Sequence, residues 1–313
     1  MDKRVFLFPG QGSQYVGMGA DLARNYPSAR NVFDEADRVL GFPLSQLCFE
    51  GPSGQLSRTK YTQPAVLTTS IAVLEVLKEK GIACHAVAGH SLGEYSALVA
   101  AGVLSFTDAL KIVQRRAELM DDAMPPGQGG MVAVLGLDRE KVEEVCRVAS
   151  AKGIVQPANY NAPGQVVISG TREGLAEAAG LARQAGARRV IPLPVSGPFH
   201  SSLMQKVGEA LKEYIKNFNF KEPDIPLVMN VTGDYVSDPE RIQDYLIEQV
   251  SSPVCWEQAM NKLSSDGFIH FTEVGPGQVL SGLVKRIIPN CKVSQVGDQA
   301  SLEKMLAQDG RTV

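Results

Sequence analysis

Short, continuously apolar runs that stop at glycine or proline recur along the chain and indicate buried strands. Val5–Phe8 stops at a Pro-Gly pair, and His85–Gly89 is a second run of this kind. Runs of this length without alternation are typical of strands covered on both faces, as in a parallel sheet. Between them, Thr62–Gly81 predicts one long helix that ends at its last glycine.

The composition of the Pro125–Gly130 segment predicts a linker. After it, the predicted strands and helices follow one another in a different order. This order is βαββαβ, which is ferredoxin-like, and the earlier α/β pattern returns after Ser196. We therefore expect an α/β fold with a large domain from residues 1–127 and 196–313 and an inserted ferredoxin-like domain at 128–195. Strands of the insert are expected at Met131–Leu137, Ile154–Asn159, Gln165–Ser169 and Arg189–Leu193, its helices at Asp138–Ala151 and Thr171–Gly186, and later strands at Pro226–Asn230 and Phe268–Val274.

Composition limits the classes of function. The 313 residues are 44% hydrophobic and 21% charged, and the net charge of −3 provides no overall basic field to recruit nucleic acid or anionic lipid. Five scattered cysteines without a C-x-x-C pair argue against a disulfide framework or a zinc site and favour a reducing compartment. The first apolar run is too short for a signal peptide, and Ala97–Leu104 is too short to span a bilayer. We expect a cytoplasmic protein that binds no metal, nucleic acid or membrane.

The segment GHSLG at 89–93 matches G-x-S-x-G, the pattern of a nucleophile elbow. The pattern alone is weak, but a predicted strand precedes Ser91 and a predicted helix follows it, as an elbow requires. The alternative is a helix N-cap, because Ser91 and Glu94 also fit the S-x-x-E capping box. An elbow serine begins a helix, so the two interpretations are compatible, and we interpret Ser91 as a nucleophile.

A serine nucleophile needs a base, and the chain has four histidines. His90 is next to Ser91, so its side chain is expected to point away from a shared site. His85 starts a predicted strand, and His270 lies inside an apolar one. His200 lies in a turn before a helix, where functional side chains gather, and is favoured by elimination over a purely structural role. No acidic residue stands out to complete a triad, so a neutral acceptor for the histidine remains open.

The helix expected from Phe106 carries two adjacent arginines with different expected surroundings. At about 100° per residue, Arg115 falls opposite the apolar stripe and Arg116 falls at its edge, facing partly inward. A half-buried arginine needs an anion as partner. The partner is either an internal carboxylate or a substrate carboxylate, which arginine can hold with two parallel hydrogen bonds.

The Pro9–Gln14 segment follows the first strand and begins like a dinucleotide fingerprint. Tyr15 stands where that fingerprint needs its third glycine, so we predict no nucleotide site. A glycine-rich strand end beside an elbow can instead supply one backbone N–H to an oxyanion hole. The residue after the nucleophile, Leu92, would supply the other. A plain structural turn is the alternative.

Seven segments together resemble the malonyl-CoA:acyl carrier protein transacylases of fatty acid synthesis. They occur in the order of that family and cover nearly the whole chain. The segments are FPGQGSQ (8–14), TQPA (62–65), GHSLGEYSAL (89–98), QRR (114–116), ANYNAPGQVVISG (158–170), SGPFHSSLM (196–204) and GPGQVLSGLVKRI (275–287).

The resemblance implies a hydrolase-like α/β core with an inserted ferredoxin-like domain, and it implies roles for the matching residues. Ser91 would be the acylated nucleophile and His200 its base. The backbone carbonyl of Gln249 would orient His200 in place of a carboxylate. The N–H groups of Gln11 and Leu92 would form the oxyanion hole, and Arg116 would bind the malonyl carboxylate.

The resemblance also implies malonyl-CoA and an acyl carrier protein as partners, with no metal or redox cofactor. An acidic carrier would dock on a local basic group, and the candidates are Lys285-Arg286, Arg188-Arg189 and Arg115. Three other functions stay open. They are a serine thioesterase or esterase, a trans-acting acyltransferase of a polyketide synthase, and a non-enzymatic pantetheine-binding module.

Overall fold

The computed structural model describes residues 3–125 and 127–310, and its strands form two separate sheets. The larger sheet has the order β10-β9-β1-β2-β7-β8 and is parallel except for the edge strand β8. The smaller sheet is antiparallel. The predicted α/β fold class, with a mostly parallel sheet and a ferredoxin-like insert, is confirmed. The strands of the larger sheet are β1 (Arg4–Phe8), β2 (Ala86–Gly89), β7 (Leu227–Val228), β8 (Tyr235–Val236), β9 (His270–Val274) and β10 (Lys292–Val296).

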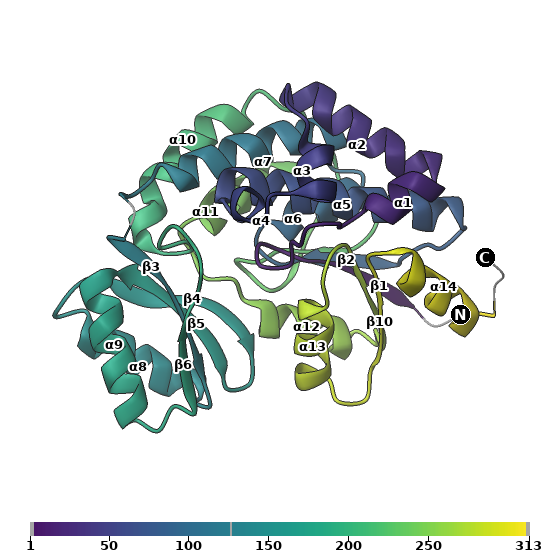
Figure 1. The fold of residues 1–313 in the computed structure, drawn as a ribbon. Helices are drawn as coiled ribbons and strands as arrows, with labels where there is room; N and C mark the ends of the chain where they lie inside the picture. The colour runs from purple at the N-terminus through teal and green to yellow at the C-terminus, as the bar shows by residue number, and fades with distance from the viewer. Residues whose placement is uncertain (1–2, 126, 311–313) are drawn as a thin grey trace.

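The central strand β1 is buried along its whole length because helices cover both faces of the larger sheet (Figure 1). Phe6 and Phe8 belong to the core under α2, α5 and α7, whereas Val5 and Leu7 belong to the core formed with α12 and α13. This two-sided burial explains why the strand sequence is apolar without alternation. The helices of the larger part are α1 (Ala20–Asn25), α2 (Pro27–Leu40), α3 (Leu44–Glu50), α4 (Ser53–Leu56), α5 (Thr59–Glu79), α6 (Gly93–Ala100), α7 (Phe106–Asp121), α10 (Gln205–Ile215), α11 (Pro239–Gln249), α12 (Trp256–Ser265), α13 (Val279–Ile287) and α14 (Gln299–Gln308), with a 3-10 turn at Ser202–Met204.

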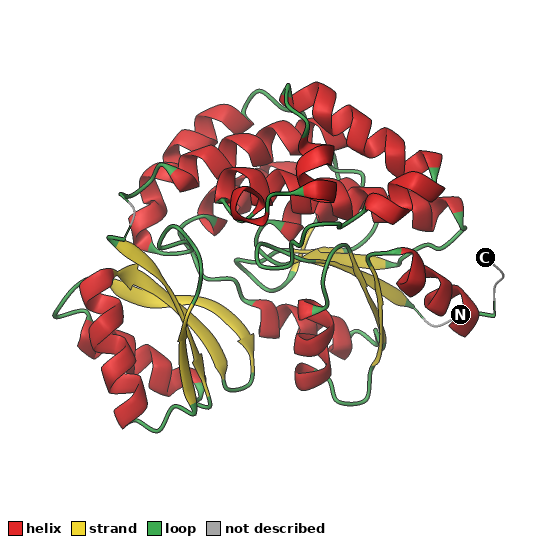
Figure 2. Cartoon of the chain, viewed as in Figure 1, coloured by secondary structure: helices red, strands yellow, loops and turns green. Residues whose placement is uncertain are grey.

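The smaller sheet has the order β4-β5-β3-β6, which is the strand order of a ferredoxin-like domain, and Figure 2 shows it beside the larger part. Val132 and Val134 of β3 pack in the core under α8 and α9, while Met131 and Ala133 on the opposite face line a pocket shared with the larger part. The division at residues 127/128 and 195/196 stays a prediction. The elements are β3 (Gly129–Leu135), α8 (Arg139–Ala149), β4 (Val155–Ala162), β5 (Gln165–Thr171), α9 (Arg172–Gln184) and β6 (Arg189–Pro192).

The predicted linker is shorter than expected. Gly129 and Gly130 already belong to β3, because they pair with Thr171 and Gly170 of β5. Pro126 of that segment lies outside the described residues. Across the described part of the chain, no helix combines the length and the apolar content needed to cross a membrane.

Parallel strands end at a common edge of their sheet, and here that edge carries the loops that matter for function. β1, β2 and β7 are neighbours, so the segments that follow them lie close together. These segments begin at Pro9, His90 and Met229. Binding sites of open parallel sheets are found outside this carboxyl edge.

Candidate active site

Ser91 stands at the sharp turn between β2 and α6, and its backbone is left-handed with a φ of 51°. Close packing requires both glycines of the motif. A Cβ on Gly89 would lie 2.0 Å from the carbonyl carbon of Gly93, and one on Gly93 would lie 2.0 Å from the oxygen of Phe8. The strand, the turn and the helix are therefore pressed together as an elbow needs.

The capping-box alternative is wrong. α6 begins only at Gly93, its N-cap is Leu92, and no side chain caps it. The Ser91 hydroxyl turns to His200 instead, and the Glu94 side chain turns into the interior.

His200 contacts both the serine and a backbone carbonyl. Its Nε2 lies 2.7 Å from the Ser91 Oγ, and its Nδ1 lies 2.8 Å from the carbonyl oxygen of Gln249. Because a carbonyl only accepts, Nδ1 carries the proton and Nε2 is free to accept from the serine. His200 is itself held in a left-handed conformation with a φ of 58° and donates its backbone N–H to Val250. Among the described residues, no carboxylate hydrogen-bonds to this imidazole.

The pKa of His200 is lowered to about 3, first by burial and then by the charge of Arg116. Burial disfavours the charged imidazolium, and a neighbouring cation adds to that effect. His200 is therefore neutral near pH 7, which is the form that a general base needs.

The other three histidines do not hydrogen-bond to the Ser91 hydroxyl. His90, whose side chain was expected to point away from a site shared with Ser91, is among the residues that line the same pocket. Its Nε2 pairs with the Asn161 Oδ1 at 2.8 Å, and its ring lies against Trp256. His85 accepts a hydrogen bond from the backbone of Arg4, and His270 begins β9.

Arg116 is more deeply buried than its helical position suggested, with only 1% of its surface exposed. Its Nη1 donates to the Gln63 Oε1 at 2.6 Å, and its Nη2 donates to the Gln249 Oε1 at 2.9 Å and to the Ser91 Oγ at 3.3 Å. Within the described residues it forms no ion pair, and its buried Nε has no hydrogen-bond partner. The Arg116 guanidinium thus has N–H donors left beside the serine. Arg115, in contrast, is exposed and pairs with Glu118.

Gln11 and Leu92 both line the pocket that contains Ser91. In the described part of the chain, neither backbone N–H donates a hydrogen bond. The Gln11 side chain is fixed separately, with its Nε2 donating to the Thr59 Oγ1 at 3.3 Å. Two free donors beside a serine hydroxyl can hold a negative oxygen.

Two residues that shape the elbow, Asn230 and Glu94, were missed from the sequence. Asn230 accepts from the Ser91 N–H at 2.6 Å and donates to the Gly89 carbonyl at 2.6 Å. Glu94 accepts from Asn230 and from the Gln249 Nε2. The available signal was Asn230 itself, a polar residue at the carboxyl end of a predicted buried strand.

The pocket around Ser91 has a volume of about 240 Å³ and lies where the two sheets meet. Ser91, His200 and Arg116 face it from the larger part, and Met131 and Asn161 face it from the smaller sheet. Among the described residues, no cluster of histidine, cysteine or acidic side chains is arranged to hold a metal.

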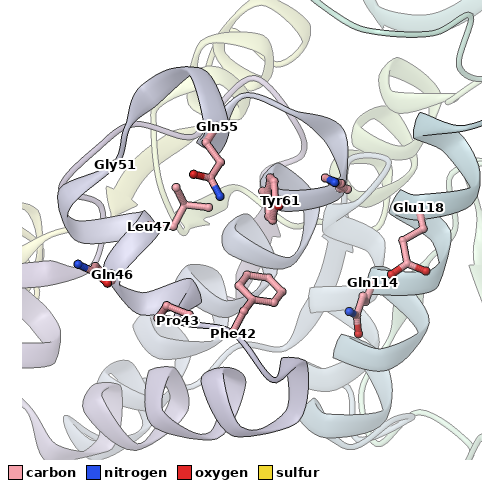
Figure 3. Close-up of a pocket in the computed structure, with 10 residues that line it drawn as sticks. Phe42, Pro43, Gln46, Leu47, Gly51, Gln55, Tyr61, Gln114 and Glu118 are labelled. Atoms are coloured by element: carbon pink, nitrogen blue, oxygen red, sulfur yellow. The ribbon is translucent and has the colours of Figure 1, made fainter. Parts of the chain in front are cut away.

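A second cavity, of about 400 Å³, is lined by none of the residues that contact the Ser91 hydroxyl (Figure 3). The Phe42 and Tyr61 rings meet edge to face there, at 5.6 Å between centroids. The lining residues are Phe42, Pro43, Gln46, Leu47, Gly51, Gln55, Lys60, Tyr61, Gln114 and Glu118.

Comparisons with known proteins give a consistent result. The family model described as "Acyl transferase domain" matches residues 5–306. The malonyl CoA-acyl carrier protein transacylase of Bacillus subtilis (strain 168) is 51% identical over 304 residues, which are 97% of this chain and 96% of that protein. The corresponding Escherichia coli (strain K12) protein is 41% identical over 98% of this chain and 99% of its own length.

Solved structures agree. An acyl-carrier-protein S-malonyltransferase from Burkholderia pseudomallei 1710b superposes with a TM-score of 0.95 at 46% identity, covering 97% of this chain and 99% of that one. A malonyl-transacylase solved in complex with its type II PKS acyl-carrier protein superposes with a TM-score of 0.95 at 41% identity, covering 99% of this chain and 100% of that one.

Proposed function

This chain belongs to the acyl transferase family, and we propose that it moves malonyl from malonyl-CoA to the phosphopantetheine thiol of an acyl carrier protein in fatty acid synthesis. One arrangement carries the proposal. The Ser91 hydroxyl lies 2.7 Å from a neutral imidazole and 3.3 Å from a buried guanidinium that has donors to spare. The imidazole suits activation of the serine, and the guanidinium suits an acyl group that ends in a carboxylate.

The first half-reaction forms an acyl-enzyme. The Ser91 Oγ attacks the thioester carbonyl carbon while its proton moves to the His200 Nε2. The carbonyl oxygen becomes negative and accepts from the N–H groups of Gln11 and Leu92. The C–S bond then breaks, and the His200 Nε2 gives the proton to the departing CoA thiolate. The Gln249 carbonyl holds the imidazole through its Nδ1–H in both states.

The second half-reaction runs through the same groups. The carrier thiol gives its proton to the His200 Nε2 and attacks the malonyl ester, and the same two amides bind the oxyanion. Collapse of the intermediate returns the proton to the Ser91 Oγ and leaves malonyl on the thiol.

The substrate carboxylate also adjusts the base. The charge of Arg116 is the second cause of the low pKa of His200. A malonyl carboxylate on Arg116 compensates that charge, so the pKa of His200 rises when malonyl is bound. A stronger base then faces the serine when the correct acyl group is present.

A serine hydrolase is the second candidate function, because it would use the same serine and histidine. The buried Arg116 and its unused donors favour transfer of a carboxylated acyl group over plain ester hydrolysis. A carrier from a polyketide pathway remains a competing acceptor, because one similar structure holds such a carrier. All five cysteines are free thiols, which supports a cytoplasmic location.

Intact-mass measurement with malonyl-CoA tests the proposal. The expected result is an adduct of one malonyl group, which a Ser91→Ala variant does not form. Addition of holo acyl carrier protein should clear the adduct and move malonyl to the carrier. Absence of the adduct in the parent protein, or free malonate as the main product with carrier present, would refute the transferase assignment.

A further inference from the structure

Glu94 is a fully buried carboxylate that the reaction steps above do not use. It lies in the first turn of α6, and its two oxygens accept three hydrogen bonds. The Glu94 Oε1 accepts from the Asn230 backbone N–H at 2.5 Å and from its Nδ2 at 2.8 Å, and the Oε2 accepts from the Gln249 Nε2 at 2.6 Å. All three partners are donors, so both carboxyl oxygens of Glu94 act as acceptors in this arrangement.

The side-chain amides of Asn230 and Gln249, which hydrogen-bond to Glu94, also hydrogen-bond to the backbone of Ser91. Asn230 has its Nδ2 on Glu94 and on the Gly89 carbonyl, and this leaves its Oδ1 facing the Ser91 N–H at 2.6 Å. A flipped amide would place its oxygen against the Glu94 carboxylate and its NH₂ against the Ser91 N–H. The carboxylate therefore selects the one orientation that supports the turn.

Gln249 extends the same ordering to the substrate-binding arginine. Its Nε2 donates to Glu94 and, at 2.9 Å, to the Ser91 carbonyl, so its Oε1 must face away. That oxygen accepts from the Arg116 Nη2 at 2.9 Å. The positive guanidinium and the negative carboxylate are thus joined through one neutral amide.

We propose that Glu94 is a positioning residue, whose carboxyl oxygens orient the amides of Asn230 and Gln249 and through them hold both the Ser91 turn and Arg116. The proposal rests on the proposed malonyl transfer. The indirect link also keeps Arg116 available, because a direct ion pair would occupy the donors that the acyl carboxylate needs. Burial raises the pKa of Glu94 to about 8, although the hydrogen bonds from Asn230 and Gln249 and the charge of Arg116 partly oppose that rise.

Two single variants separate position from charge. Glu94→Gln keeps the shape and removes the charge, and its NH₂ must face a donor on either Asn230 or Gln249. Glu94→Asp keeps the charge but withdraws the carboxylate by about one C–C bond, roughly 1.5 Å. If position matters, both variants should lower kcat/KM for malonyl-CoA by about 10- to 100-fold, mostly in kcat, and should lower the malonyl-to-acetyl preference. Glu118→Gln, an exposed glutamate on α7, is the matched control and should behave as the parent.

An exchange variant provides the second test. In Glu94→Gln with Gln249→Glu, the amide introduced at position 94 can still accept from Asn230 and can donate to the carboxylate introduced at position 249, whose other oxygen accepts from Arg116. Because the carboxylate at position 249 pairs directly with Arg116, the malonyl rate should stay low, whereas the rate with acetyl-CoA should recover above that of Glu94→Gln. This recovery should be partial, because the Ser91 carbonyl has lost its donor. This variant and Glu94→Asp decide the matter if Glu94→Gln does not fold, as judged by circular dichroism and Tm.

Three results would overturn the positioning role. The first is parent-like kinetics in Glu94→Gln. The second is parent-like kinetics in Glu94→Asp but not in Glu94→Gln, which would leave only charge as the cause. The third is an increased malonyl preference in Glu94→Gln, which is what simple removal of a negative charge predicts. The malonyl adduct on the parent protein is measured alongside. A missing adduct refutes the proposed function, whereas a normal adduct with unaffected variants refutes the role of Glu94 alone.

Discussion

Replacement of Arg116 by alanine is the sharpest test of how this pocket selects its acyl group. In the parent, Arg116 is 1% exposed, and three of its hydrogen bonds go to Gln63, Gln249 and Ser91. None of these partners carries a formal charge, so the carboxylate of malonyl would be the first full anion to contact the guanidinium directly.

The size of the effect follows from what each substrate loses. Two charge-assisted hydrogen bonds to a malonyl carboxylate are worth about 1.5–3 kcal/mol each, or about 3–6 kcal/mol together. At about 1.4 kcal/mol per factor of ten, malonyl transfer should fall by about 100- to 10,000-fold in kcat/KM. Acetyl has no carboxylate and loses only the 3.3 Å contact between Arg116 and the Ser91 Oγ, so it should fall by less than about 10-fold.

The assay measures CoA release from malonyl-CoA and from acetyl-CoA with holo acyl carrier protein as acceptor. Arg116→Lys, which keeps the charge but not the planar fork, should recover part of the malonyl rate and is the matched variant. Arg115→Ala on the exposed face of the same helix controls for effects on α7 and should leave the ratio unchanged. If Arg116→Ala kept the malonyl-to-acetyl ratio of the parent, recognition of the carboxylate by this arginine would be refuted.

Three further predictions concern the base and the elbow. The pKa of His200 is lowered to about 3, so the imidazole stays neutral down to acid pH. The kcat/KM of the acylation step should therefore show no loss between pH 8 and pH 5. A fall in kcat/KM with a midpoint near pH 6.5 would contradict this. The same shift predicts that stability is unaffected by His200 above about pH 6.5 and falls as the pH drops from there toward 3, because the unfolded histidine binds a proton that the folded one excludes. Gly93→Ala should cost about 3 kcal/mol or more, because its Cβ would lie 2.0 Å from the Phe8 oxygen, and urea unfolding measures this. The control is Gly180→Ala in α9, where a Cβ has no neighbour within 4 Å and about 0.5–1 kcal/mol of stabilisation is expected; an equal effect at the two sites would refute the close-approach argument.

Local sequence patterns were sufficient to predict the main elements. The unbroken apolar run of β1 indicated a strand covered on both faces, and the predicted helix at Thr62–Gly81 is α5 with its start moved to Thr59. The linker after Pro125 was drawn too long because glycine composition gives no information on pairing. Only the register between β3 and β5 brings Gly129 into a strand.

The candidate reacting groups were also accessible from the sequence. G-x-S-x-G with its flanking elements pointed to Ser91, elimination among four histidines pointed to His200, and the helical position of Arg116 pointed inward. The resemblance to a known family added Gln11 and Gln249. The structure brings Gln11, Ser91, His200 and Arg116 to one pocket. Gln249 contacts His200 and Arg116, and the roles of all these residues stay proposals that the variants above test.

By itself, the sequence determined where most of the main strands and helices lie, because burial and periodicity act over a few neighbouring residues. The edge strands β8 and β10 were not predicted. The sequence also determined the chemical types available to the site. Only the tertiary structure decided that His90 lines the pocket but pairs with Asn161, that Arg116 is fully buried, and that Glu94 and Asn230 meet behind the elbow. Glu94 and Asn230 are 136 positions apart in the chain. Such contacts depend on how β2, β7 and α11 pack together, and no local pattern carries that information.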